Sequence, residues 1–114
     1  MSTRVRTQTS VALRRRRRQV LRRLPPIDRL LRGSLIERYK PCGKPGCKCA
    51  RGRGHGPKYY LSVSHYGQRP QMDYIPQDYQ SQASECLANY HRLREILDEV
   101  CAINHELLCR REAL

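Results

Sequence analysis

Apolar residues near the start of the chain follow a helical spacing. In residues 11–24, VALRRRRRQVLRRL, the apolar positions form one narrow stripe: Leu13, Val20, Leu21 and Leu24. This spacing predicts a helix, which ends at Pro25 because the residue before a proline is pushed out of the helical region. Residues 1–10 are polar without periodicity and are expected to be a flexible lead. The arginines at 14–18 repel one another, so we expect full helix formation only against a partner or the body of the protein.

A second, shorter helix is predicted after the prolines. Pro26 suits the first turn of a helix, and Gly33 is typical of the residue that follows a helix end. Between them lie three apolar residues that share a face: Ile27, Leu30 and Leu31. We expect this helix, ending at Arg32, to pack on the domain and to place the arginine-rich arm at its edge.

Strand-like alternation replaces the helical spacing in the middle of the chain. Residues 34–40 (SLIERYK), 58–66 (KYYLSVSHY) and 69–75 (RPQMDYI) are rich in strand formers, and Gly67 lies in a turn between the last two. These segments predict a three-stranded antiparallel sheet in which a loop links the first two strands. Pro70 suits an edge strand better than a central one.

The last third of the chain has the spacing of one long helix. Its seam advances in alternating steps of three and four, starting at Ala83 and Cys86 and continuing through Tyr90, Leu93, Leu97, Val100, Asn104 and Leu107. The last six are candidate contacts for a second copy or a partner protein, in a coiled coil whose register is set by the buried Asn104 amide. Ile96, Ile103 and Leu108 widen the stripe, which suits packing on the sheet or on the N-terminal helix. Both interpretations stay open.

Together these elements predict an α+β fold with a basic N-terminal helix, a small three-stranded antiparallel sheet and a long C-terminal helix. Along the chain we expect a basic arm at 1–24, partly disordered or helical, a core at 25–76 and the amphipathic helix at 77–114. With 114 residues and neither Trp nor Phe, the core is small. A metal or an oligomer contact would add stability that burial does not supply.

The positive charge of the chain is concentrated at its N-terminus. The formal net charge is +13, and residues 1–32 hold eleven arginines against one acidic residue, Asp28. Arginine binds phosphate through two hydrogen bonds, and neutralised phosphates release counterions, so nucleic acid is the expected partner. An anionic membrane surface is the weaker alternative, and a merely solvated tail is the simplest one. The candidate phosphate contacts of the arm are Arg14, Arg15, Arg16, Arg17, Arg18, Arg22 and Arg23.

Four residues with metal-ligand chemistry lie within fourteen positions: Cys42, Cys47, Cys49 and His55. Three thiolates and one imidazole suit a closed tetrahedral zinc(II) site, which is structural because it leaves no position open for water. We predict one structural zinc ion in a zinc knuckle between the first two strands. His55 is its weakest ligand, and His65 is the substitute. The alternative is a flexible loop with unligated thiols.

Basic residues and glycines alternate around these ligands. The glycines allow close approach of the backbone to a ligand, and five cations are candidate phosphate contacts: Lys44, Lys48, Arg51, Arg53 and Lys58. In the simpler alternative the lysines only keep the site soluble. Three nearby tyrosines are expected to pack the sheet rather than to stack on bases: Tyr59, Tyr60 and Tyr66.

The sequence contains no constellation that predicts catalysis. It has no Walker-type phosphate loop, no pair of acidic residues in a plausible pocket and no Ser-His-Asp set. We therefore do not expect an enzyme. No apolar run is long enough to span a bilayer, and the N-terminus lacks a signal-peptide hydrophobic region. We therefore expect a cytoplasmic protein, nucleoid-associated if it binds DNA. In a reducing compartment, clustered Cys and His indicate metal rather than disulfides.

Several sequence blocks resemble an uncharacterised prokaryotic domain family: GSLIERY at 33–39, CGKPGCKC at 42–49 and HGPKYYL at 55–61, followed by NYHRL at 89–93. The resemblance implies that the three cysteines and His55 act as one unit in a zinc-binding accessory module. Members of the family are often found beside transposases, which implies mobile DNA as a setting. The five-arginine run departs from the family's usual pattern.

The sequence thus predicts a small zinc-binding protein that binds nucleic acid, DNA rather than RNA, as an accessory factor of transposition or recombination. A transposase or recombinase is the expected protein partner, and a second copy of the chain is a further one. The competing hypothesis is a protein-interaction adaptor, or an RNA-binding protein, in which zinc is purely structural.

Overall fold

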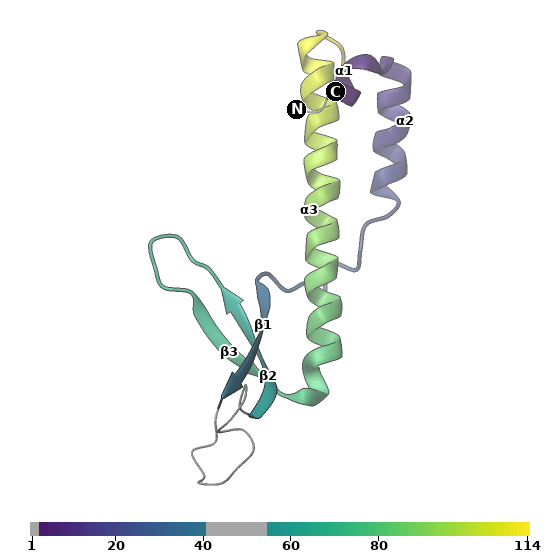
Figure 1. Ribbon diagram of the computed structural model, residues 1–114. Helices are drawn as coiled ribbons and strands as arrows, with labels where there is room; N and C mark the ends of the chain where they lie inside the picture. Colours follow the sequence, from purple (N-terminus) through teal and green to yellow (C-terminus); the bar gives the residue numbers. More distant parts are fainter. Residues whose placement is uncertain (1–2, 41–54) are drawn as a thin grey trace, which may run out of the picture. The chain divides into compact units, whose positions relative to one another are not determined.

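The chain folds into helices and one small sheet. The structure is a computed structural model that describes residues 3–40 and 55–114 (Figure 1). In chain order the elements are α1 (Thr3–Thr7), α2 (Ser10–Leu21), β1 (Ser34–Lys40), β2 (His55–Val63), β3 (Gln71–Ile75), the 3₁₀ helix η2 (Gln77–Tyr79) and α3 (Gln80–Cys109). The α+β class and the three-stranded antiparallel sheet are confirmed. The predicted zinc knuckle falls on residues 41–54, outside the described residues.

The chain divides into two compact units. The helical unit comprises residues 1–30 and 88–114, and the sheet unit comprises residues 31–87. The helical unit therefore joins the two ends of the chain. Of the linear segments expected from the sequence, 1–24 lies within the helical unit, whereas 25–76 and 77–114 each run across both units.

The sheet unit is a meander in the order β1-β2-β3. Tyr60 of the central strand lies opposite Ile36 on one side and opposite Tyr74 on the other. The register of the first pair shifts between Arg38 and Lys40. β3 is an edge strand and begins directly after Pro70, in agreement with the edge position expected for that proline.

The core of the sheet unit lies where the sheet meets the start of α3. Ile75 at the end of β3 is buried, and so are Ala83 and Leu87 in the first turns of α3. The backbone N–H of Leu31 donates to the Cys86 carbonyl at 3.1 Å. This bond ties the chain just before β1 to the same helical turns.

The segment between α2 and β1 is irregular, and the helix predicted over residues 26–32 is not formed. Ile27 is exposed, whereas Leu30 and Leu31 are half-buried, so the three residues do not form the shared buried face that was expected to hold that helix. The Arg29 carbonyl instead accepts a hydrogen bond from the Asn89 side-chain amide at 3.0 Å.

Replacing Gly33 with alanine is expected to destabilise the sheet unit. Gly33 does not end a helix: it precedes β1 with φ +135°, and a Cβ there would lie 2.6 Å from the Ser62 carbonyl oxygen. Because such a backbone conformation is close to glycine-only, Gly33→Ala should lower the free energy of unfolding by about 2–3 kcal/mol, measured by urea denaturation. Gly67→Ala is the control, since Gly67 has φ +71° and nothing within 4 Å of the added Cβ. Equal losses in the two variants would contradict the close approach.

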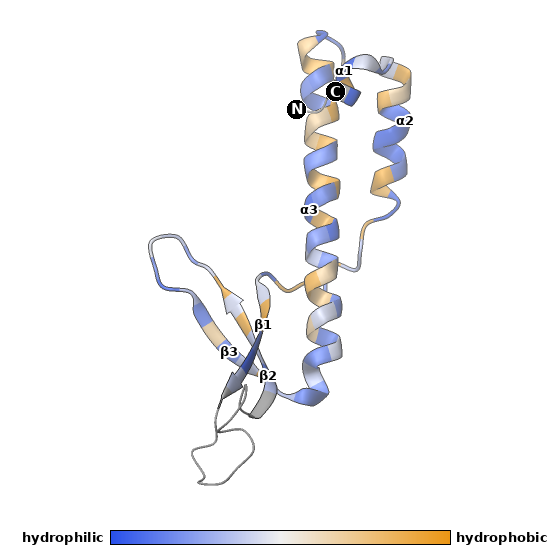
Figure 2. Ribbon diagram, in the orientation of Figure 1, coloured by the Kyte–Doolittle hydropathy of each residue, from blue (hydrophilic) through white to orange (hydrophobic). Residues whose placement is uncertain are grey.

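In the helical unit α2 lies beside α3 and runs in the opposite direction (Figure 1). The helix predicted over residues 11–24 is confirmed, although it ends at Leu21. It begins at Ser10 because the Thr9 hydroxyl accepts a hydrogen bond from the Ala12 amide at 3.1 Å and so caps the first turn. Figure 2 shows that α2 is hydrophilic in its arginine-rich middle and more apolar toward both ends.

The core of the helical unit is built by residues from both ends of the chain. Leu13 packs with Ile103 and Leu107, and Val5 of α1 packs against this cluster. The expectation of a flexible lead is therefore wrong for the described residues 3–10, because α1 forms and Val5 has a core to cover. Val20 is also buried, whereas two other residues of the predicted α2 stripe are exposed: Leu21 and Leu24.

The buried stripe of α3 shares Leu107 with the predicted seam but replaces Leu97 and Asn104 by the residues one position earlier. In the helical unit α3 buries Ile96, Ile103 and Leu107, whereas Leu97 is 50% exposed and Asn104 is half-buried. Both sets of positions fit alternating steps of three and four. The packing of α2 on α3 selects the stripe that contains the two isoleucines.

Candidate nucleic-acid interface

The arginine run of α2 is divided between two sides of the helix. Successive residues of an α-helix are rotated by about 100°, so five consecutive arginines do not share one environment. Arg14, Arg16 and Arg17 are half-buried, whereas Arg15 and Arg18 are exposed. The half-buried three all contact α3 or the residues that follow it.

Arg16 forms a two-bond ion pair with Glu99 of α3. Its Nε lies 2.6 Å from Glu99 Oε1, and its Nη2 donates to Oε2 at 3.3 Å. The hydrogen bond to Glu99 raises the pKa of Arg16 above its ordinary value, so this guanidinium stays charged. Because both side chains are about one third exposed, the pair orients α2 on α3 more than it stabilises the fold.

Arg17 is hydrogen-bonded to Asn104, the residue that was expected to set the register of a coiled coil. Its Nη1 donates to Asn104 Oδ1 at 2.5 Å, so the amide oxygen serves a contact within the chain. Of the other predicted seam residues, Leu107 is in the core and Leu97 is exposed. The remaining three are half-buried: Tyr90, Leu93 and Val100.

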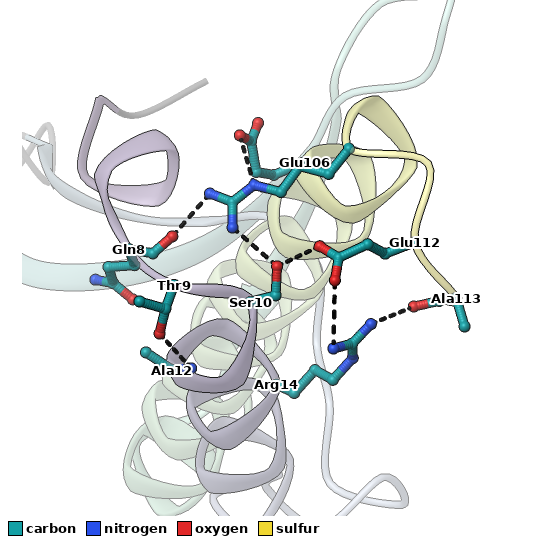
Figure 3. A network of polar contacts seen from close by, with 9 residues as sticks. Gln8, Thr9, Ser10, Ala12, Arg14, Glu106, Glu112 and Ala113 are labelled. Atoms are coloured by element: carbon teal, nitrogen blue, oxygen red, sulfur yellow. Dashed lines mark hydrogen bonds and ion pairs between the residues drawn. The ribbon is translucent and has the colours of Figure 1, made fainter.

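A polar network joins the start of α2 to the residues after α3 (Figure 3). Arg14 donates to the Ala113 carbonyl at 2.9 Å and lies 3.9 Å from the Glu112 carboxylate. Glu112 also accepts a hydrogen bond from the Ser10 hydroxyl. Arg14 is therefore engaged within the helical unit, as Arg16 and Arg17 are.

Arg110 is the centre of this network, and the sequence indicated only its pairing with Glu106 on the exposed side of the helix. Its guanidinium contacts Glu106 Oε1 at 3.2 Å and the Ser10 hydroxyl at 3.0 Å. It also donates to the carbonyls of Gln8 at 2.7 Å and Arg6 at 3.3 Å, groups near the end of α1 that lack helical partners. The spacing of four between Glu106 and Arg110 by itself indicates only a surface pair.

Three arginines on the outer side of α2 remain available for a ligand. Arg15, Arg18 and Arg22 follow one another in steps of three and four, which puts them on one side of a helix. Arg22 continues the turn as the C-cap of α2, with φ −73° and ψ −13°. All three are exposed, and their guanidinium groups have no ion-pair partner in the described part of the chain. We call these three residues the arginine row; Arg23, also exposed, adjoins it.

The row ends at a pocket of about 610 Å³ within the helical unit. Arg22, Arg23 and Arg92 line the pocket with three cations, and Glu95 adds one acid beside the ion pair of Arg16. The lining therefore keeps a positive balance. A pocket of this character suits a small anionic group such as phosphate.

The predicted metal site lies mainly outside the described residues, because Cys42, Cys47 and Cys49 all fall within residues 41–54. His55 is the first residue of β2 and pairs with Lys40 at the end of β1, so strand pairing holds both ends of the 41–54 segment together. His65 follows the other end of β2, about 26 Å or more along the strand, which leaves His55 as the histidine beside that segment. No three His, Cys, Asp or Glu side chains in the described ranges are grouped to hold a metal.

The basic and aromatic residues predicted around the knuckle have mixed outcomes. Lys58 is exposed on β2 and lies opposite Arg38. Tyr59 and Tyr60 are half-buried in the sheet, but Tyr66 is fully exposed in the hairpin loop and packs on nothing. The other predicted loop cations lie outside the described residues: Lys44, Lys48, Arg51 and Arg53.

Comparison with known proteins places the chain in a family. Residues 11–85, more than half of the chain, match the family described as Domain of unknown function (DUF6788). The chain belongs to this family. No curated protein and no solved structure matches the chain. The resemblance expected from the sequence blocks is thereby confirmed at the level of an uncharacterised family.

The DUF6788 region contains the arginine row but not the residues that hold α2 in place. It includes α2 except Ser10, the three strands and the first turns of α3, and it ends before Glu99, Asn104 and Arg110. No helix in the described ranges combines the length and apolar content needed to cross a membrane.

Proposed function

We propose that this DUF6788 protein binds nucleic acid, duplex DNA in the first place, through phosphate contacts of the arginine row. The observation that carries the proposal is the row itself. Arg15, Arg18 and Arg22 are exposed side by side on one helix, without an acidic partner among the described residues. Guanidinium groups with unused donors suit phosphate oxygens, which accept two parallel hydrogen bonds.

The inner arginines support the proposal by anchoring the helix that carries the row. Arg16 and Arg17 bind side chains of α3, so the row is presented on a packed helix rather than on a flexible tail. A surface ordered before binding loses less conformational entropy when the ligand arrives. The row extends over eight residues, about 10 Å along the helix axis, and the positive pocket beside it offers a place for one more phosphate.

The charge of the helical unit supports the same ligand. The unit contains fourteen arginines, no lysine and six acidic residues. Three of those acids already accept contacts from arginines: Glu99, Glu106 and Glu112. Arg15, Arg18 and Arg22 therefore contribute part of the excess positive charge on the exposed side of α2, where it attracts the phosphate backbone.

Binding of duplex DNA should depend on the arginine row more than on total charge. We expect the variant with Arg15→Ala, Arg18→Ala and Arg22→Ala to bind a duplex about 100-fold more weakly near 0.1 M salt. The slope of log K against log salt concentration should fall by about 2.7, because each phosphate contact contributes about 0.9. Fluorescence anisotropy of the full chain across a salt titration measures both quantities.

A charge-matched variant is the control for this experiment. Arg6→Ala, Arg94→Ala and Arg111→Ala remove three other exposed arginines of the helical unit and should leave most of the slope intact. Equal losses of duplex affinity and of salt slope in the two variants would contradict a binding site at the arginine row. A wild-type chain that binds neither duplex DNA nor duplex RNA at low salt would overturn the proposal in favour of a protein-interaction adaptor.

We further propose that residues 41–54 and His55 hold one structural zinc ion. Three cysteine thiolates and one imidazole fit the softness and coordination number that zinc(II) prefers. The pairing of Lys40 with His55 supports the site, because it keeps the ends of the ligand-bearing segment on neighbouring strands. Bound zinc would supply structure rather than catalysis and would hold the loop cations in one arrangement.

The proposed setting is transposition or recombination, where this chain would assist a transposase or recombinase. The family resemblance supports this setting by association only. Phosphate contacts give affinity and position but no sequence selection, so the partner enzyme would choose the DNA site. A cytoplasmic, nucleoid-associated location follows from the proposal.

A further inference from the structure

One face of the sheet brings tyrosines and cations together. Residues opposite one another in antiparallel strands have their side chains on the same face. Ile36, Tyr60 and Tyr74 therefore form one row across the three strands. The adjacent row contains Arg38 and Lys58, which also face each other. We call these five residues the tyrosine face.

The two tyrosines of this face differ in what they offer to a ligand. The rings of Tyr60 and Tyr74 are 5.8 Å apart between centroids and meet edge to face at 63°. The Arg38 guanidinium carbon lies 5.8 Å from the centroid of the Tyr60 ring, close enough for a cation–π contact. Tyr60 is thus held from two sides, while Tyr74 is 56% exposed and presents open ring surface.

The described charges of the strands are sorted between the two faces of the sheet. The cations Arg38 and Lys58 lie on the tyrosine face, whereas the register puts the acids Glu37 and Asp73 on the opposite face. Each acid accepts a hydrogen bond from a side chain two residues away on its own strand, at 2.6 and 3.1 Å respectively. The tyrosine face is therefore aromatic and positive, without an acid among its described residues.

A pocket adjoins the exposed tyrosine within the sheet unit. Its volume is about 550 Å³, and Lys58 and Tyr74 form part of its lining. Gln77 and Gln80 line it as well. Amide side chains both donate and accept hydrogen bonds, which suits the polar edge of a base lying beside the tyrosine ring.

We propose that the tyrosine face binds unpaired nucleotides, with a base stacked on Tyr74 and adjacent phosphates at Arg38 and Lys58. Aromatic rings flanked by cations suit single strands, because every base has a stacking face and the backbone is negative along its length. Bases inside a duplex are already stacked on one another and are not accessible to a sheet. The site goes beyond the proposed duplex contacts, since it uses other residues in another unit.

Sequence reasoning did not favour base stacking here and did not single out Tyr74. Tyr60 and Tyr74 are fourteen residues apart in the chain, and only the strand register makes them neighbours. The same register separates Tyr59 from them, because it lies opposite Ile75 on the other face.

Substitution of Tyr74 in the full chain tests the site. Tyr74→Ala is expected to weaken binding of an oligothymidylate of about 12 nucleotides by at least about fivefold, whereas Tyr74→Phe keeps the ring and stays within about twofold of wild type. The matched control is Tyr79→Ala, because Tyr79 is 59% exposed but lies on η2, and it should leave affinity unchanged. Equal losses in the two alanine variants, or equal losses in the alanine and phenylalanine variants, would overturn the proposal.

Photocrosslinking of the wild-type chain provides a test that does not depend on folding of a variant. An oligonucleotide carrying 5-iododeoxyuridine should crosslink to Tyr74 or Tyr60, identified by mass spectrometry. Crosslinks confined to α2 would overturn the assignment. Oligouridylate tested in parallel shows whether the unpaired strand is RNA or DNA, since both share this chemistry.

The two proposals can fail separately. When Tyr74→Ala is added to the arginine-row variant, it should still weaken single-strand binding, so failure of the duplex proposal is distinguishable from failure of this one.

Discussion

Leu107→Ala is expected to lower the free energy of unfolding of the helical unit by about 2–5 kcal/mol. Leu107 has 0% exposure and packs with Leu13 and Ile103. Truncation removes buried apolar surface and leaves a cavity that a helix pair closes only in part. Because folded domains are stable by only about 5–15 kcal/mol, this single change removes a large fraction of the total.

The neighbouring leucine is the control for that measurement. Leu108 is 50% exposed, so Leu108→Ala should change the free energy of unfolding by less than about 0.5 kcal/mol. Urea denaturation of both variants, followed by circular dichroism, makes the comparison. If both substitutions lower the free energy of unfolding equally, the side of α3 that faces α2 has been misassigned. The separation of the α2 arginines into half-buried and exposed ones then fails as well.

Cys47→Ser is expected to remove zinc from the protein and to unfold the segment that the metal closes. Structural zinc contributes about 10–16 kcal/mol of apparent binding free energy in small zinc-finger peptides. That contribution exceeds the loss expected from any one core substitution in this chain. Serine keeps the size of the side chain but does not supply a thiolate ligand at neutral pH.

Elemental analysis of purified protein measures this effect directly. We expect about one zinc ion per chain in the wild type and close to none in Cys47→Ser. Cys101→Ser is the control, because Cys101 is a free, exposed thiol on α3, and this variant should retain the metal. Wild-type protein without zinc, or a Cys47→Ser variant that keeps it, would contradict the proposed site.

The existence of the three strands was predictable from their composition and alternation, but two of the bounds differ. The expected strand 58–66 is found at His55–Val63, and the expected strand 69–75 at Gln71–Ile75. The alternation in SLIERYK predicted β1 over Ser34–Lys40, and the structure has the same bounds. The turn around Gly67 was predictable too, since glycine tolerates the φ of +71° found there. Register was not predictable, because it depends on which strands meet, and register is what places Tyr60 beside Tyr74.

For the helices, the spacing of apolar residues did not predict which side chains are buried. Both Ile96 and Leu97 fit the seam of α3, and so do Ile103 and Asn104, but only the isoleucines are buried. The same packing gives Val5 of α1 a core contact that its polar surroundings in the sequence did not indicate. Conversely, the apolar residues of 26–32 do not share one buried face, because Ile27 is exposed while Leu30 and Leu31 are half-buried, and that segment stays irregular.

By itself the sequence determined that a basic helix precedes a three-stranded sheet, and that a metal-type ligand cluster lies between the first two strands. The tertiary structure alone decided which arginines are available to a ligand. In five consecutive arginines nothing local distinguishes one from the next. Glu99, Asn104 and Ala113 lie far along the chain and engage Arg16, Arg17 and Arg14, because α3 packs on one side of α2. Arg15 and Arg18 remain on the other side, since the rotation of the helix turns them away from α3. Arg22 continues the row at the pocket that α3 also lines.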